Sequence, residues 1–168
     1  MTQLPNNPIA QFVRRATSRD HETLLRIINE AYLVERFFVD GDRIAPDVLT
    51  RLMGKGTFLI GDDDGRARAC VYVEVRGERG YFGLLAVDPG SQRGGWGRRM
   101  IAAAEAYCRD AGCVALDINV VNLRTELPPF YKTLGYVETG SAPFTDPRAT
   151  RPCHMIVMTK DLKVPGGS

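Results

Sequence analysis

The sequence has few of the side chains that hold metal ions, and it has no excess of charge of either sign. It contains two histidines and four cysteines in 168 residues, and no two of the cysteines form a Cys-x-x-Cys pair. This scarcity weighs against a structural zinc site. The 22 basic and 20 acidic residues leave a formal net charge of only +2. Such a balance predicts neither a nucleic-acid partner nor a membrane-surface partner.

Long apolar runs and a leader pattern are missing as well. No run approaches the ~20 apolar residues that a membrane span needs, and residues 1–11 lack the basic-then-apolar order of a signal peptide. We therefore expect a cytoplasmic protein in which cysteines such as Cys70 and Cys108 are reduced core thiols. The length fits one domain over 1–168, with flexible ends at 1–10 and 163–168.

Apolar periodicity and Gly/Pro punctuation predict alternating strands and helices. Expected strands lie at 12–16, 57–61, 67–75, 81–87, 114–120, near 137 and at 153–159, and expected helices begin near 17–18, at 46 and at 96, with another inside 122–134. Hairpin turns are expected at 62–65 and 77–80, and 81–87 is the most apolar strand. The order predicts an α/β or α+β fold with one mixed, mostly antiparallel sheet of six to seven strands and about four helices.

The segment between the 81–87 strand and the 96–111 helix is suited to bind phosphate. The start of a helix leaves about four N–H groups unpaired and carries partial positive charge. Glycine lets the backbone approach an anion closely, and cationic side chains would add attraction. The residues concerned are Gln92, Arg93, Gly94, Gly95, Trp96, Gly97 and Arg98. A diphosphate fits this segment, and the alternative is that the glycines only form a tight turn.

Two linked motifs resemble those of the GCN5-related N-acetyltransferases. Leu84-Leu85-Ala86-Val87-Asp88-Pro89 followed by Gln92-x-x-Gly95-x-Gly97 is similar to the family's acetyl-CoA signature. Downstream, Asn122 and Phe130-Tyr131-Lys132-Thr133-Leu134-Gly135-Tyr136 look like its second cofactor segment. The resemblance covers about 12–162 in element order and is specific over 84–136. It implies an acyl-CoA N-acyltransferase fold, acetyl-CoA as co-substrate and no metal.

The resemblance also implies roles for single residues. The strand at 84–87 would carry a bulge that opens a gap for pantetheine, and Leu85, Ala86 and Val87 would bind it through their backbone. The amide near Leu85 would polarise the thioester carbonyl. Tyr131 would protonate the departing thiolate, or it is only a buried helix aromatic. Asn122 would contact the cofactor, or it caps the next helix.

The general base and the acceptor site are less defined in the sequence. Tyr81 stands where some family members have a glutamate, so the candidate bases are Glu35 and Glu74, directly or through water; either is equally read as a surface charge. The acceptor pocket should draw on 32–42 and 141–152. In or directly after the first segment, Asp40 and Asp42 suggest recognition of a cation, whereas Arg36 and Arg43 suggest recognition of a carboxylate. An amino-acid-like acceptor would use both signs.

The function predicted from these motifs is acetylation of a primary amine on a small molecule, by direct attack on the thioester. The alternatives are a protein or peptide N-acetyltransferase of the same fold, and a non-catalytic acyl-CoA-binding domain. Because dimers are common in the family, a homodimer is one expected assembly. The sequence does not name the acceptor amine.

Overall fold

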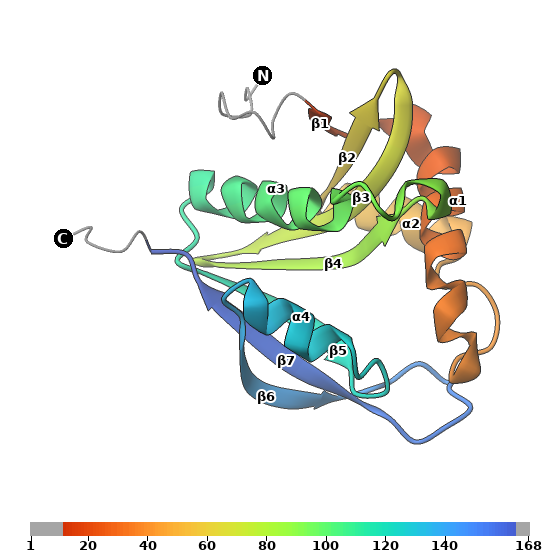
Figure 1. The fold of residues 1–168 in the computed structure, drawn as a ribbon, viewed down its shortest axis with the longest axis vertical. Coiled ribbons are helices and arrows are strands. Elements are labelled where there is room, and N and C mark those ends of the chain that lie inside the picture. The colour runs from red at the N-terminus through yellow and green to blue at the C-terminus, as the bar shows by residue number, and fades with distance from the viewer. Residues whose placement is uncertain (1–11, 164–168) are drawn as a thin grey trace.

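A seven-stranded mixed sheet forms the centre of the molecule, with strand order β1-β2-β3-β4-β5-β7-β6 (Figure 1). The computed structural model describes residues 12–163, so the expected flexible ends lie outside the described residues except for Lys163. The strands are Val13–Arg15, Thr57–Asp63, Arg66–Arg76, Arg79–Val87, Ala115–Val121, Val137–Pro143 and His154–Asp161, from β1 to β7. The α-helices are His21–Ala31 (α1), Pro46–Lys55 (α2), Trp96–Asp110 (α3) and Leu127–Thr133 (α4). The predicted fold class is confirmed.

Local turn chemistry explains several of the element boundaries. Asp64 and Gly65 both have positive φ, 53° and 71°, and form the two-residue turn between β2 and β3. Thr17 begins the first helical segment through a capping box with Asp20, and this 3-10 turn leads into α1. The expected helix starts at Pro46 and near residue 96 are likewise observed.

A β-bulge interrupts β4 where it pairs with β3. Cys70 lies opposite Ala86 and Tyr72 lies opposite Gly83, so two β4 residues, Leu84 and Leu85, stand against the single residue between them on β3. Leu84 adopts a left-handed φ of 51°, a rare conformation for a leucine. One extra residue shifts the side-chain alternation of the strand. Accordingly, Phe82 packs with the α3 side of the core, whereas Leu84 packs with the α1 side.

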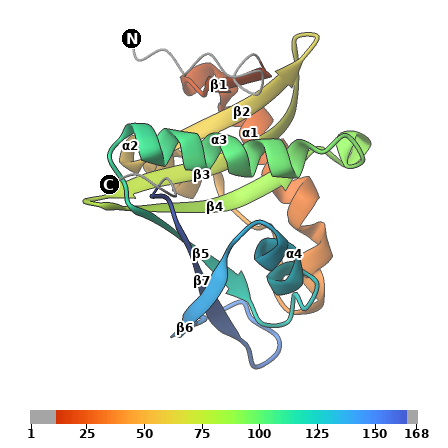
Figure 2. The same ribbon diagram turned by 60° about the vertical axis from the view of Figure 1, so that its left-hand side comes forward.

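The sheet divides where β4 meets β5. These two strands are parallel and pair only over Arg79–Tyr81 with Ala115–Asp117. Figure 2 shows β5, β7 and β6 turning away from β2, β3 and β4 beyond that junction. The bulge and this early end of pairing leave Leu84 and Leu85 with no register partner in either neighbouring strand among the described residues.

Two apolar clusters cover the two faces of the sheet. One contains Trp96, Met100 and Ala104 of α3 together with Tyr131 of α4, and the other contains Leu24, Ile27 and Ile28 of α1. Trp96 lies so close to β2 that a Cβ on Gly61 would come within 2.6 Å of its ring. Cys70, Cys108 and Cys113 are buried free thiols, and Cys153 is a half-buried one.

Candidate active site

The start of α3 is built as an anion-binding turn. Gly95 is the N-cap residue and has a φ of 73°, which glycine adopts without strain. Among the described residues, the backbone N–H groups of Gly95, Trp96, Gly97 and Arg98 make no hydrogen bond, whereas the N–H of Arg99 donates to Gly95 O at 3.2 Å. A Cβ at Gly95 or Gly97 would meet no protein atom within 4 Å. The turn thus presents free donors at the positive end of a helix to open space.

Buried groups behind this turn hold it in place. Asp88 is 4% exposed; its carboxylate accepts a hydrogen bond from Arg26 at 3.3 Å and lies 3.6 Å from Arg66. Its backbone N–H donates a hydrogen bond to Arg68 O, and its carbonyl oxygen accepts one from Ser91 N, at 2.7 Å each. The side chain of Trp96 is buried in the core, so its contribution to the turn is its backbone amide. Sequence reasoning did not assign Asp88 this anchoring role, although an Asp-Pro-Gly run is typical of a tight turn.

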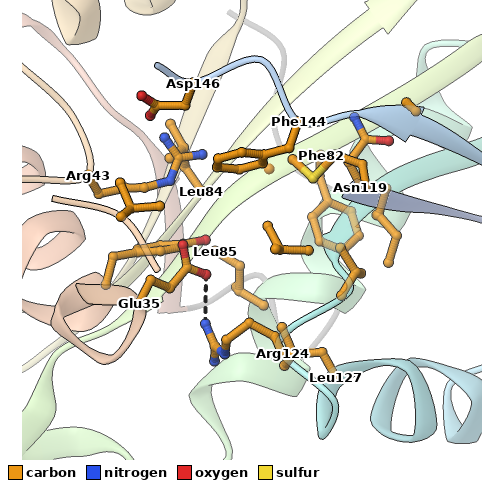
Figure 3. A pocket seen from close by; sticks show the side chains of 18 of the residues that line it. Glu35, Arg43, Phe82, Leu84, Leu85, Asn119, Arg124, Leu127, Phe144 and Asp146 are labelled. Atoms are coloured by element: carbon orange, nitrogen blue, oxygen red, sulfur yellow. Dashed lines mark hydrogen bonds and ion pairs between the residues drawn. The ribbon is translucent and has the colours of Figure 1, made fainter. Parts of the chain in front are cut away.

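A cavity of about 450 Å³ opens where β4 and β5 diverge (Figure 3). Its lining comes from five regions that are far apart in the sequence: the segment after α1, the β4 bulge, the outer half of β5, the α4 region, and the end of β6 with the segment that follows it. The lining side chains include Tyr32, Glu35, Val39, Arg43, Phe82, Leu84, Leu85, Asn119, Arg124, Leu127, Tyr131, Phe144 and Asp146. The cavity therefore brings together all three predicted catalytic positions, Leu85, Tyr131 and Glu35.

Tyr131 lies on α4 and lines the cavity with only 7% of its surface exposed. Its ring packs against Phe82 and Tyr136, with centroid separations of 6.2 and 5.7 Å. Within residues 12–163 its hydroxyl makes no hydrogen bond to protein. Burial raises the pKa of Tyr131 to about 12. The phenol therefore stays protonated at neutral pH and is free to donate to a group inside the cavity.

Glu35 lies on the 3-10 helix Tyr32–Phe37 and is nearly buried. Its carboxylate accepts a hydrogen bond from Arg124 at 2.8 Å, and Arg124 also bonds Glu126 at 2.6 Å. Burial raises the pKa of Glu35, and the charge of Arg124 offsets part of that rise. A carboxylate with a raised pKa, in a cavity, can accept a proton. Sequence reasoning missed Arg124, whose partner is 89 residues away.

Two other predicted site residues are not brought to the cavity. Glu74 accepts hydrogen bonds from Tyr72 and Arg76, both at 2.8 Å, and Arg76 holds its pKa below the usual range. It lies outside the lining, so the structure does not support it as a base. The side-chain oxygen of Asn122 accepts a hydrogen bond from the His154 amide at 2.9 Å. Asn122 therefore ties β5 to β7; it neither lines the cavity nor caps α4, whose N-cap residue is Glu126.

The two segments expected to form the acceptor pocket do meet over the cavity. Tyr32, Glu35 and Val39 line it from one side, and Ala142 to Asp146 from the other. A β-bridge between Val39 and Ala149 joins the two segments. It is flanked by backbone bonds from Asp40 N to Arg148 O at 3.1 Å and from Thr150 N to Phe38 O at 2.8 Å.

The charges inside the pocket differ from those expected. Arg36 and Asp42 form an exposed ion pair with each other at 3.2 Å, and neither they nor Asp40 belong to the lining. Arg43, beyond the end of the expected 32–42 segment, does belong to it. Within residues 12–163 no three His, Cys, Asp or Glu side chains are arranged to hold a metal ion. No helix of this region is long and apolar enough to cross a membrane.

Comparison with known proteins places this geometry in a family. The Acetyltransferase (GNAT) family profile matches residues 21–136. No curated protein matches the chain at a significant level. Similar solved structures include the ribosomal-protein-S18-alanine N-acetyltransferase from Escherichia coli, at 18% identity and a TM-score of 0.72, covering 93% of this chain and 96% of that one.

Two further structures show the same fold. Ard1 from Thermoplasma volcanium has a TM-score of 0.72 at 19% identity, covering 89% of this chain and 95% of that one. The protein yncA from Salmonella typhimurium, solved with its cofactor acetyl-CoA, has a TM-score of 0.71 at 16% identity, covering 92% and 95%. With the family profile spanning more than half of the sequence and the whole fold shared, the chain belongs to the acetyltransferase (GNAT) family.

Proposed function

We propose that this protein transfers the acetyl group of acetyl-CoA to a primary amine on a small molecule, by direct attack of the amine on the thioester. The observation that carries the proposal is that the β4 bulge, Tyr131 and Glu35 line one cavity. A hydrogen-bonding backbone, a proton donor and a proton acceptor are the three elements that acyl transfer to an amine requires.

The residues present fit the donor substrate. The free N–H groups of Gly95 to Arg98 suit its diphosphate, and Arg93 and Arg98 are exposed beside them. Leu85, Ala86 and Val87 lie along the opened edge of β4, where a chain of amides can bond to the strand. Acetyl-CoA would supply the activated acyl group and the acceptor would supply the attacking amine, while the protein contributes the groups that bind them and move protons.

Each cavity residue then has a distinct task. The Leu85 amide, held by the bulge, would bond the carbonyl oxygen as negative charge develops on it. Glu35 would accept a proton from the amine, because its raised pKa makes it a stronger base than an exposed glutamate. Tyr131 would donate its proton to the leaving sulfur. A phenol suits this step because it stays protonated at neutral pH and can therefore donate its proton as negative charge develops on the sulfur.

The shape of the acceptor side favours a small molecule over a peptide. An extended peptide needs a groove that is open at both ends, so that its chain can continue beyond the acetylated residue. Here the Val39–Ala149 bridge and its two flanking hydrogen bonds join the two segments that line the acceptor side of the cavity. A continuous wall on this side leaves no exit between the two segments for a peptide chain, which favours a small acceptor.

A panel of amines and peptides, with thiol release as the readout, tests the proposal. We expect release of coenzyme A to depend on a small primary amine and to be undetectable with peptides carrying the same terminal residue. In parallel, acetyl-CoA should raise the midpoint of thermal unfolding in proportion to the logarithm of its concentration. Release with peptides alone would assign the protein to the peptide-modifying class. If a large excess of acetyl-CoA left the midpoint of thermal unfolding unchanged, acetyl-CoA would not be the acyl donor.

A further inference from the structure

Arg43 is a charged side chain of the cavity that makes no hydrogen bond and no ion pair within residues 12–163. It lies in the loop between the 3-10 helix Tyr32–Phe37 and α2, it is half-buried, and it lines the cavity. Its guanidinium sits over the ring of Tyr32, 5.2 Å from the centroid. A cation held in a cavity by an aromatic face keeps its N–H donors available to a ligand.

The remaining charged residues of the lining are already paired. Glu35 is bonded to Arg124 at 2.8 Å, and Arg124 is bonded to Glu126 as well. Asp146 is held by Arg148 through its side chain, at 2.9 and 3.1 Å, and through its backbone amide at 2.9 Å. Within residues 12–163, Arg43 is therefore the one charged group of the lining left without a partner.

Asp146 forms no hydrogen bond and no ion pair with Arg43 within residues 12–163. Figure 3 shows the Arg43 guanidinium directed toward Asp146, with no hydrogen bond or ion pair drawn between them. Three donors of Arg148 already occupy the two carboxylate oxygens of Asp146 and hold its pKa below the usual range. The free donors of Arg43 are thus left for a group that enters the cavity.

We propose that the acceptor is an amine that also carries a carboxylate, and that Arg43 binds this carboxylate; the inference rests on the proposed function. A guanidinium presents paired N–H donors that match the two oxygens of a carboxylate. Arg43 lines the same cavity as Leu84 and Leu85, so a carboxylate on Arg43 leaves the amine of the same molecule close to the bulge. The aromatic rings of Tyr81, Phe82 and Phe144 complete the lining and suit an uncharged body between or beside the two groups.

The test compares amines that differ only in the carboxylate. Each amino acid of the panel is assayed beside its carboxamide and its decarboxylated amine, for example phenylalanine beside phenylalanine amide and 2-phenylethylamine. For the best pair, we expect kcat/KM of the carboxylate to exceed that of both neutral analogues about 10- to 100-fold, the usual worth of a charge-assisted hydrogen bond. Arg43→Met should remove that preference by lowering kcat/KM for the carboxylate alone, and Arg43→Lys should keep part of it.

Arg36→Met is the matched control, because Arg36 is exposed, pairs with Asp42 and lies outside the lining. It should keep the full preference. A wild-type enzyme that acetylates the neutral analogues as well as the carboxylates would overturn the inference while leaving the acetyltransferase proposal intact. An Arg43→Met variant that retains the preference would overturn it equally.

A binding measurement separates this inference from turnover. The amino acid is titrated into protein saturated with coenzyme A, where no acetyl group can be transferred, and thermal unfolding is followed. We expect a rise in midpoint with the carboxylate, none with its decarboxylated amine, and no rise in Arg43→Met. An equal rise with both ligands contradicts a carboxylate subsite, whether or not any amine is acetylated in the panel.

Discussion

Tyr131 and Tyr136 are neighbouring tyrosines in different environments, and their ring centroids are 5.7 Å apart. The Tyr131 hydroxyl opens into the cavity, whereas the Tyr136 hydroxyl is buried and has no hydrogen-bond partner in the part of the chain that the structure describes. One hydroxyl is therefore positioned for chemistry, and the other is a cost to stability. The pair lets a proton donor be tested against a neighbour of identical type.

Tyr131→Phe should lower kcat about 100-fold, because the leaving thiolate loses its proton donor. The KM for acetyl-CoA should change little. Tyr136→Phe should leave kcat unchanged and raise the free energy of unfolding by about 1 kcal/mol, since it removes an unpaired buried hydroxyl. Thiol release and urea unfolding measure the two effects. Equal activity in Tyr131→Phe and wild type would exclude the acid role.

The pH dependence of kcat should report on Glu35. Burial raises its pKa above that of an ordinary glutamate, so the fraction of the basic form falls, and with it the rate, at a pH higher than expected for an exposed carboxyl. Glu35→Gln should lower kcat about 100-fold and abolish this acidic limb. Glu126→Gln, which changes the exposed partner of Arg124, should keep it. An unchanged pH profile in Glu35→Gln would assign the base elsewhere.

At the scale of single elements, both ends of α3 depend on a left-handed glycine. Gly95 precedes the helix with a φ of 73°, and Gly112 follows it with a φ of 88°. A Cβ would meet no protein atom within 4 Å at either position, so an alanine at either one costs only backbone strain. The positions differ in what faces them: Gly95 stands at the unpaired N–H groups, and Gly112 at the opposite end of the helix.

Gly95→Ala should weaken acetyl-CoA binding about 10-fold, whereas Gly112→Ala should not affect it. Each should destabilise the fold by about 1–2 kcal/mol, the cost of a left-handed conformation for an L-residue. Calorimetric titration with acetyl-CoA, together with thermal unfolding, separates binding from stability. If both variants lost affinity equally, the diphosphate would not lie at the start of α3.

The helices, strands and turns that could be predicted from the sequence are those whose boundaries have local signals. The Asp64-Gly65 turn, Pro46 at the start of α2 and Gly112 after α3 each follow from the conformation that one residue type prefers. The β4 bulge was predicted only through the resemblance to a family, because nothing in the sequence around Leu84 indicates that this leucine adopts a positive φ. For Glu74 the sequence left the base role and its alternative open, although one signal was local: Arg76 lies on the same strand face two residues on, and pairs with it.

At the scale of the whole molecule, sequence reasoning could not see pairings between distant segments. Glu35 contacts Arg124, which is 89 residues away in the sequence. Val39 likewise pairs with Ala149. Neither pairing has a local signal, because each depends on how distant segments come together around the cavity. The division of the sheet also predicts dynamics. Only three residue pairs join β4 to β5, so the β1–β4 part and the β5–β7–β6 part are expected to open as separate units.

Hydrogen exchange measured by mass spectrometry should show this. Without ligand, we expect amides of β5–β7–β6 to exchange at a rate different from those of β2–β4. Acetyl-CoA bound between β4 and β5 should slow exchange on both sides together. Uniform protection across the sheet in the free protein would show that the junction does not separate two units.

The bridge between Val39 and Ala149 has a consequence for redesign. The two segments that it joins form the acceptor wall, while the β4 bulge and the α3 turn belong to other parts of the chain. A graft from another enzyme into one loop alone would lose its partner across the bridge. Exchanging 36–45 and 142–152 as one cassette preserves that pairing and leaves Glu35 with Arg124, so the acceptor pocket can be replaced while the acetyl-CoA-binding residues stay unchanged.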